Sequence, residues 1–160
     1  MHSYDLYSSE ADSSVISADM ARLPLDSCTV DAAVYSLSLM PTNLKDIIRE
    51  ANRILKPSGQ LLVVEVASRF ADYQSGSADR RGSLNVAKKD GGKEKVVNLD
   101  LQRFAADLKP YGFSLTASEP LPPNGFFTYL AFKKTGDAER LTPKSRLPEI
   151  VLKACLYKAR

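Results

Sequence analysis

Polar and apolar positions group into blocks along the chain, and two of these blocks are apolar almost throughout. They are residues 30–40 (VDAAVYSLSLM) and 60–68 (QLLVVEVAS), each bounded by turn-forming residues. Continuous runs of this length are typical of strands buried on both faces, as in a parallel sheet. We therefore expect two buried strands, the first ended by Pro41 and the second preceded by Gly59.

The segment between these runs has helical periodicity. Asn43 is placed to cap its N-terminus, Asp46 adds a negative charge to the first turn, and residues 56–59 (KPSG) end it. A strand, a helix and a strand with short connections predict a right-handed parallel crossover and an α/β open sheet. The apolar stripe consists of Leu44, Ile47, Ile48, Ala51, Ile54 and Leu55.

Further elements are expected on both sides of this unit. A short strand is predicted at 14–18, and a helix at 99–108 is ended by Pro110 and Gly112. The runs 113–120 and 126–134 read as strands, and the turn between them (PPNG) predicts an antiparallel pair at the edge of the sheet. The remaining tail is irregular, although residues 150–156 could bury a few side chains.

Residues 74–97 carry no clear periodic pattern. QSGSADRRGSLNVAKKDGGKEK (74–95) is rich in glycine, serine and charge and has few large apolar residues to offset its ordering entropy. We predict a flexible basic insertion at 74–97 that separates two parts, 1–73 and 98–160, of one domain.

Composition narrows the function classes. The 160 residues carry a net charge of +3, and no apolar run approaches the about 20 residues that cross a bilayer. A single histidine and two cysteines without ligand spacing, Cys28 and Cys155, predict no metal site and no Ser-His-Asp triad. The basic stretches 80–95 and 133–160 could contact phosphate or simply be solvated, and both interpretations stay open.

Four side chains follow predicted strands, where open α/β sheets bind their ligands. Asp5 follows HSYDL, Asp19 and Met20 follow the strand at 14–18, and Ser36 lies near the end of the next strand. Carboxylates can accept hydrogen bonds from ribose hydroxyls or an exocyclic amine, and a thioether can contact a flat base. An adenosine-type ligand fits this set. The alternative, in which the aspartates only form turns or caps, stays open.

Several longer stretches resemble the ribosomal RNA-processing protein 8 family. They are ADMARLPLDSCTVDAAVYSLSLM, TNLKDIIREANRILKPSGQLLVVEVASRF, FFTYLAFKKTG and CLYKAR. The resemblance implies a Rossmann-like class I methyltransferase that uses S-adenosylmethionine to form 1-methyladenosine in large-subunit ribosomal RNA. It further implies a nucleolar location in the nucleus, with ribosomal RNA and pre-ribosomal or nucleolar proteins as partners. We expect neither a membrane nor a metal as partner, in line with the composition.

The same resemblance gives roles to the four side chains. Asp5 matches the acid that holds the ribose, Asp19 and Met20 match the pair that flanks the adenine, and Ser36 matches a further cofactor contact. The family's glycine-rich cofactor loop belongs before HSYDL and has no counterpart in this sequence. We therefore expect an N-terminally truncated methyltransferase sheet with an exposed edge, and weak cofactor binding by this chain alone.

Two other functions remain possible on the sequence alone. One is a non-catalytic fragment, or an RNA- or chromatin-binding module that has lost the cofactor loop. The other is a nucleotide-dependent oxidoreductase in which Asp5 holds the ribose of a nicotinamide cofactor. No catalytic base is identified. Phe70 and Tyr73 could stack on a base or pack in the core, and Arg69 could contact phosphate or form a surface ion pair.

Overall fold

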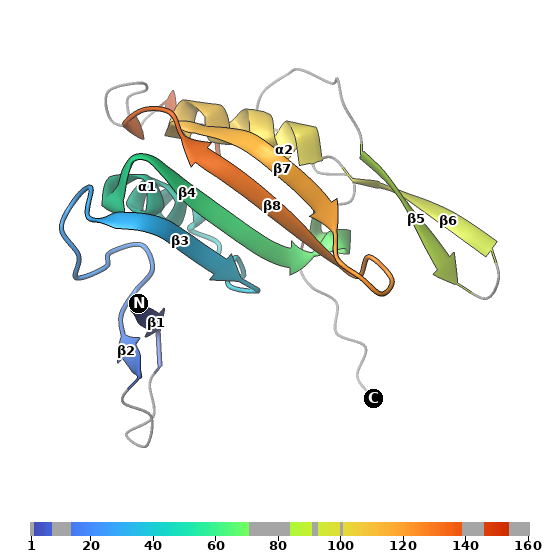
Figure 1. The fold of residues 1–160 in the computed structure, drawn as a ribbon, viewed down its shortest axis with the longest axis horizontal. Helices are drawn as coiled ribbons and strands as arrows, with labels where there is room; N and C mark the ends of the chain where they lie inside the picture. Colours follow the sequence, from blue (N-terminus) through green and yellow to red (C-terminus); the bar gives the residue numbers. More distant parts are fainter. Residues whose placement is uncertain are drawn as a thin grey trace.

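The computed structural model describes residues 2–7, 14–70, 101–138 and 146–153, together with the backbone of 84–90 and 93–99. Within these residues the strands form three separate sheets (Figure 1). The largest has the strand order β3-β4-β8-β7, and the other two are the pairs β1-β2 and β5-β6. The elements are β1 (Ser3–Asp5), β2 (Val15–Ser17), β3 (Val30–Ser36), α1 (Leu44–Ile54), β4 (Leu55–Val66), η1 (Ala67–Phe70), β5 (Leu84–Asp90), β6 (Lys93–Leu99), α2 (Leu101–Leu108), η2 (Lys109–Tyr111), β7 (Phe113–Pro120) and β8 (Phe127–Lys134).

The predicted crossover from β3 through α1 to β4 is confirmed. β3 and β4 pair in parallel, and the hydroxyl of Tyr35 on β3 donates to the carbonyl of Ile47 on α1 at 3.3 Å. Asn43 occupies the capping position of α1, but its side chain makes no capping hydrogen bond. Its carbonyl instead accepts hydrogen bonds from the amides of Asp46 and Ile47, at 3.0 and 3.3 Å.

The C-terminal half adds the predicted antiparallel edge. β8 pairs antiparallel with both β4 and β7, so β7 forms the outer strand of this sheet. Gly112 turns the chain from η2 into β7 with a φ of 81°. A Cβ at this position would clash with the carbonyl oxygen of Gly136, so the close approach of these two segments requires glycine.

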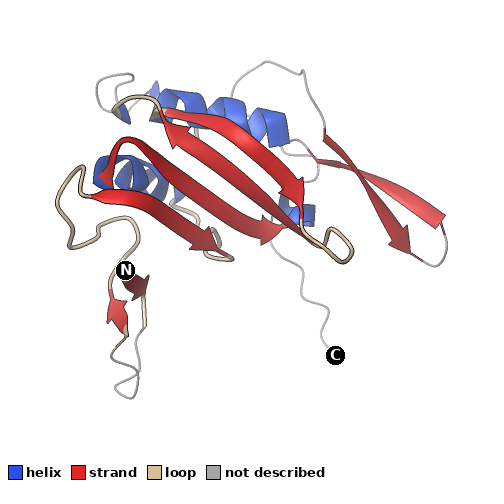
Figure 2. Cartoon of the chain, viewed as in Figure 1, coloured by secondary structure: helices blue, strands red, loops and turns tan. Residues whose placement is uncertain are grey.

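The core lies between this sheet and its two helices, which Figure 2 shows on the same side of the sheet. Phe104 of α2 is fully buried, and its ring centroid lies 5.1 Å from that of Phe70 and 6.1 Å from that of Phe132. Phe70 therefore packs in the core and does not stack on a ligand. The other large, fully buried side chains are Tyr111, Phe113, Leu39, Ile47, Ile48, Leu55, Leu61 and Leu101.

The opposite face of the sheet is more open. Val34 on β3 is 63% exposed, and Leu62, Val64 and Tyr129 are half-buried. The expectation that residues 30–40 form a strand buried on both faces is therefore wrong: β3 ends at Ser36 and alternates between buried and exposed positions. The physical reason is that, within the described residues, the helices cover one face only (Figure 2).

Regular structure also occurs where none was predicted. β5 and β6, within the segment 74–97 and its border, pair antiparallel in a register that joins Val86 to Val97. Short apolar stretches in each strand give these residues β-propensity that their charged surroundings obscure. Of the predicted tail, Ile150 and Leu152 are buried, whereas residues 154–156 lie outside the described residues, as does Tyr73.

Replacing Phe104 tests the assigned core. Phe104→Ala should lower the free energy of unfolding by about 3–5 kcal/mol, because it removes a ring packed between two others and leaves a cavity. Urea denaturation followed by circular dichroism measures this change. Tyr7→Ala, at a side chain 79% exposed, should change it by less than about 0.5 kcal/mol. A loss below about 1 kcal/mol for Phe104→Ala would contradict the packing described.

Candidate functional site

Two of the predicted site residues, Asp5 and Asp19, lie at the same end of one small sheet. β1 and β2 run parallel, with Asp5 opposite Ser17, and the amide of Ala18 donates to the carbonyl of Asp5 at 2.8 Å. Asp19 follows directly. Both carboxylates therefore extend beyond the carboxyl end of this strand pair, the position that the sequence predicted for them.

Both aspartates also support the local backbone. Oδ1 of Asp5 accepts a hydrogen bond from the amide of Tyr7 at 3.2 Å, and Oδ1 of Asp19 accepts one from Ala21 at 2.8 Å. The turn-forming role left open above is thus real. Both side chains are exposed, and among the described residues these hydrogen bonds use only their Oδ1 atoms. Each carboxylate can therefore accept further hydrogen bonds from a ligand. Met20 is half-buried and packs against the core.

Ser36 is in a different sheet. It is exposed at the end of β3 and lies opposite Val64 of β4. The expectation that all four residues line the rim of one sheet is therefore wrong for the described residues, because β1 and β2 pair only with each other there. Hydrophobic patterns locate the ends of strands, but they do not say which strands hydrogen-bond to one another.

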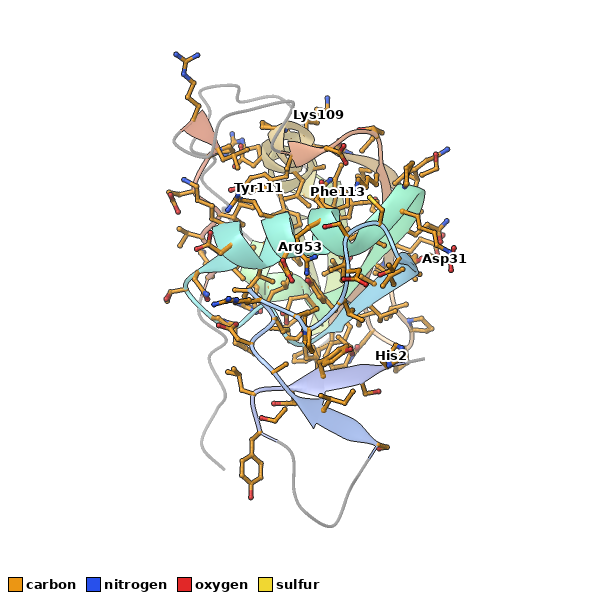
Figure 3. All side chains as sticks on the ribbon, turned by 90° about the vertical axis from the view of Figure 1, so that its left-hand side faces the viewer. His2, Asp31, Arg53, Lys109, Tyr111 and Phe113 are labelled. Atoms are coloured by element: carbon orange, nitrogen blue, oxygen red, sulfur yellow. The ribbon has the colours of Figure 1, made fainter. Side chains whose placement is uncertain are left out.

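The linker from β2 to β3 is held by a buried charge on α1. Glu50 is 7% exposed, and its Oε1 accepts hydrogen bonds from the amide of Leu23 and from Nη2 of Arg53, both at 2.7 Å. Arg53 also donates through Nε to Oε2 of Glu50 at 2.8 Å and through Nη2 to the carbonyl of Leu23 at 3.3 Å. Figure 3 shows Arg53 on α1, above the β1-β2 sheet.

The ionisation of Glu50 reflects these contacts. Burial alone would raise the pKa of Glu50, but the hydrogen bonds from Arg53 and Leu23 and the charge of Arg53 outweigh it and hold the pKa below its ordinary value. The hydrogen bond to Glu50 likewise raises the pKa of Arg53. Sequence reasoning missed this pair, because an i, i+3 Glu and Arg on a helix usually form a solvated surface contact.

A polar cleft of about 690 Å³ runs beside α1 and includes one of the predicted site residues. Asp19 lines it near Glu50 and Arg53, whereas Asp5, Met20 and Ser36 do not. The cleft thus does not join the four predicted residues. Its remaining lining residues are Ala21, Ser27, Cys28, Asn43, Asp46, Arg49, Asn52, Asp137 and Ala138.

Arg69 has a different role from either one predicted. It is 3% exposed, and its Nη1 donates to Oε2 of the fully buried Glu65 at 2.7 Å. It is therefore neither a phosphate ligand nor a surface ion-pair partner. The Glu65/Arg69 spacing of four residues is the only sequence signal of this pair, and it gives no indication of burial.

Neither a metal site nor a membrane-spanning helix occurs among the described residues. These residues contain no group of three or more His, Cys, Asp or Glu side chains able to hold a metal, and Cys28 is a free, exposed thiol. Within the same residues, the helices are too short or too polar to cross a membrane.

Comparison with known proteins identifies the family. The model of a family described as hypothetical methyltransferase matches residues 1–80, half of the chain. The chain belongs to this family. Membership favours a methyltransferase over the oxidoreductase considered above.

Curated relatives match the chain over its whole length. Ribosomal RNA-processing protein 8 from Rattus norvegicus is 38% identical over 160 residues, which are 100% of this chain and 28% of the relative. The 25S rRNA (adenine(645)-N(1))-methyltransferase of Schizosaccharomyces pombe is 36% identical over 163 residues, which are 100% of this chain and 40% of the relative. The chain therefore spans less than half the length of these relatives.

Solved structures confirm the predicted Rossmann-like methyltransferase fold. An S-adenosylmethionine dependent methyltransferase from Mesorhizobium loti superposes with a TM-score of 0.53 at 16% identity. The match covers 81% of this chain and 78% of that chain. The likeness concerns the fold alone.

Removing the charge of Glu50 tests the linker anchor. Because the folded-state pKa of Glu50 is lowered, its stabilisation is present above the unfolded-state pKa of about 4.3 and is lost as the pH falls through the folded-state value. Glu50→Gln should lower the free energy of unfolding by about 1–3 kcal/mol at pH 7. The difference from the wild type should shrink below about pH 4.

Urea unfolding at pH 7 and pH 3 measures both effects. Asp31→Asn is the matched control, because Asp31 forms an exposed ion pair with Lys56 and should contribute less than about 1 kcal/mol. A Glu50→Gln effect that is the same at both pH values would contradict the assigned role of the charge.

Proposed function

We propose that the full-length protein transfers a methyl group from S-adenosylmethionine to N1 of an adenine in large-subunit ribosomal RNA. One observation carries this proposal: the entire chain aligns at 36% identity with a relative named as an N1-specific adenine methyltransferase of 25S rRNA. Membership in a methyltransferase family and the methyltransferase fold are consistent with it.

The candidate residues suit the adenosine part of this cofactor. Asp5 and Asp19 extend beyond the carboxyl end of β1 and β2 and retain acceptor capacity for ribose hydroxyls or the adenine amine. The half-buried Met20 offers apolar surface to the purine ring. We assign these three residues and Ser36 to cofactor binding. When bound, S-adenosylmethionine supplies a methyl group already activated by the sulfonium.

The transfer step then needs alignment more than acid–base chemistry. Bound S-adenosylmethionine would supply the methyl group to N1 of the adenine and leave as a neutral thioether. The positive charge would pass to the methylated ring, so the chain's own residues would not need to move a proton in this step. The chain must therefore hold the base in line with the methyl group and exclude its pairing partner, since N1 is blocked in a base pair.

Partners and location follow from the same relatives. We propose ribosomal RNA as substrate, pre-ribosomal or nucleolar proteins as neighbours, and a nuclear, nucleolar location. The names of the relatives concern ribosomal RNA processing. The lysine-rich strands β5 and β6 add positive charge suited to a phosphate backbone.

A second function has an observation in its favour. The four candidate cofactor residues are divided between two sheets, so a module that binds RNA without binding the cofactor remains a candidate. It predicts RNA binding that does not depend on Asp19.

Asp19→Ala in the full-length protein separates the two functions. It should weaken S-adenosylmethionine binding by about 10-fold to 100-fold, the cost of losing hydrogen bonds to a charged group. Isothermal titration calorimetry measures the affinity, and transfer of a labelled methyl group to ribosomal RNA measures activity. Asp31→Ala, an exposed aspartate on β3, should leave both unchanged. If the wild-type protein binds RNA but neither binds S-adenosylmethionine nor transfers the label, the methyltransferase function is refuted and the RNA-binding module is supported.

A further inference from the structure

The loop after β3 begins with a strained residue. Leu37 has a φ of 54°, a conformation that bulky side chains rarely adopt, and its amide donates to the carbonyl of Val64 at 2.9 Å. The chain thus turns sharply where β3 ends, alongside β4. Residues held in such conformations cluster at ligand-binding and active sites, because the surrounding structure must compensate for their cost.

A buried guanidinium fixes this loop. Arg69 donates through Nη2 to the carbonyl of Leu39 at 2.7 Å, through Nε to the carbonyl of Lys153 at 2.9 Å, and through Nη1 to Glu65 at 2.7 Å. All three nitrogens of Arg69 are therefore engaged. Leu39 itself is 1% exposed and anchors the loop in the core.

The residues on either side of this anchor face outward. Leu37 is 39% exposed and Met40 is 40% exposed. On the other side of β4, Phe126 is 46% exposed, and its carbonyl accepts a hydrogen bond from the amide of Ala67 at 2.9 Å. Leu37, Met40 and Phe126 are here called the acceptor surface. The hydrogen bonds between Leu37 and Val64 and between Phe126 and Ala67 place this surface at the carboxyl end of β4, an element that Figure 1 labels.

A lysine-rich strand pair lies next to η1. β6 contacts η1, the short helix that carries Arg69, and the β5-β6 pair brings Lys88 opposite Lys95 and Lys93 opposite Asp90. The two strands together contain four lysines and two acidic residues. Basic segments combined with exposed aromatic and apolar side chains are typical of proteins that bind single-stranded nucleic acid.

We infer that the acceptor surface contacts the unpaired adenine that is methylated, and that Arg69 and Glu65 are positioning residues for this contact. The inference rests on the proposed function. Apolar side chains and an aromatic ring at the carboxyl end of an open sheet provide a platform for the face of a purine. Arg69 acts through Leu39, because it determines where Leu37 and Met40 are presented.

Exposed substitutions test the surface without disturbing the fold. In the full-length protein, Phe126→Ala and Met40→Ser should each raise the KM for an unpaired ribosomal RNA fragment by about 5-fold to 100-fold. The melting temperature and the affinity for S-adenosylmethionine should not change. Leu25→Ser is the control, because this half-buried leucine lies before β3, away from the acceptor surface.

Arg69→Lys tests positioning. Lysine keeps the charge beside Glu65 but cannot form the three-way contact, so kcat should fall about 10-fold while cofactor affinity stays at the wild-type value. If this variant does not fold, the two exposed variants still decide the inference.

The outcomes distinguish the inference from the function on which it rests. A wild-type protein that transfers no label to RNA would refute the proposed function and the inference with it. Normal transfer by both exposed variants would refute the inference alone. If the variants act normally on naked RNA but fail on pre-ribosomal particles, the surface binds a protein, and the inference is overturned as well.

Discussion

The buried ion pair between Glu65 and Arg69 fixes the carboxyl end of the four-stranded sheet. The guanidinium of Arg69 joins Glu65 on β4 to the loop after β3 and to the C-terminal segment. Oε1 of Glu65 also accepts a hydrogen bond from the amide of Val66 at 2.9 Å. Removing one member of a buried pair typically costs about 3–5 kcal/mol, because the other charge is left without a partner. Three segments far apart in the sequence therefore depend on this one contact.

A second buried cation fixes the opposite end of β4. Lys134 is 3% exposed, and its Nζ donates to the carbonyls of Asn52 and Leu55 at 2.7 and 2.9 Å, which satisfies carbonyls where α1 passes into β4. Nearby, Glu50 and Arg53 attach the β2–β3 linker to the same helix. The hydrophobic core sets the layers of the fold, and these charged contacts set where the connecting segments lie.

The sequence predicted those elements whose apolar period is long and bounded by clear turn residues. The apolar stripe predicted α1, and the PPNG turn predicted the strand pair β7 and β8. Gly112 correctly marked the turn into β7. The strands β5 and β6 were missed, because their apolar residues are few and surrounded by charge. The open face of β3 was missed because a continuous apolar run does not reveal whether a second layer covers it.

The strand-end positions of the candidate residues were predictable, but the way in which the strands assemble was not. Asp5 and Asp19 follow strands as expected, yet the division of the strands into two sheets depends on pairings that single-residue patterns do not encode. The half-buried pair Glu50/Arg53 and the buried pair Glu65/Arg69 could not be recognised from the sequence for a related reason. Their residue types are those of surface ion pairs, and only the three-dimensional packing buries Glu50, Glu65 and Arg69.

Mass spectrometry of nucleosides from large-subunit ribosomal RNA tests the central claim most directly. The comparison is between cells with and without the gene that encodes this chain, with the deletion complemented by the wild type or by Asp19→Ala. The proposed activity predicts that 1-methyladenosine disappears from one site on deletion and returns with the wild type but not with the variant. An unchanged level of 1-methyladenosine after deletion would contradict it.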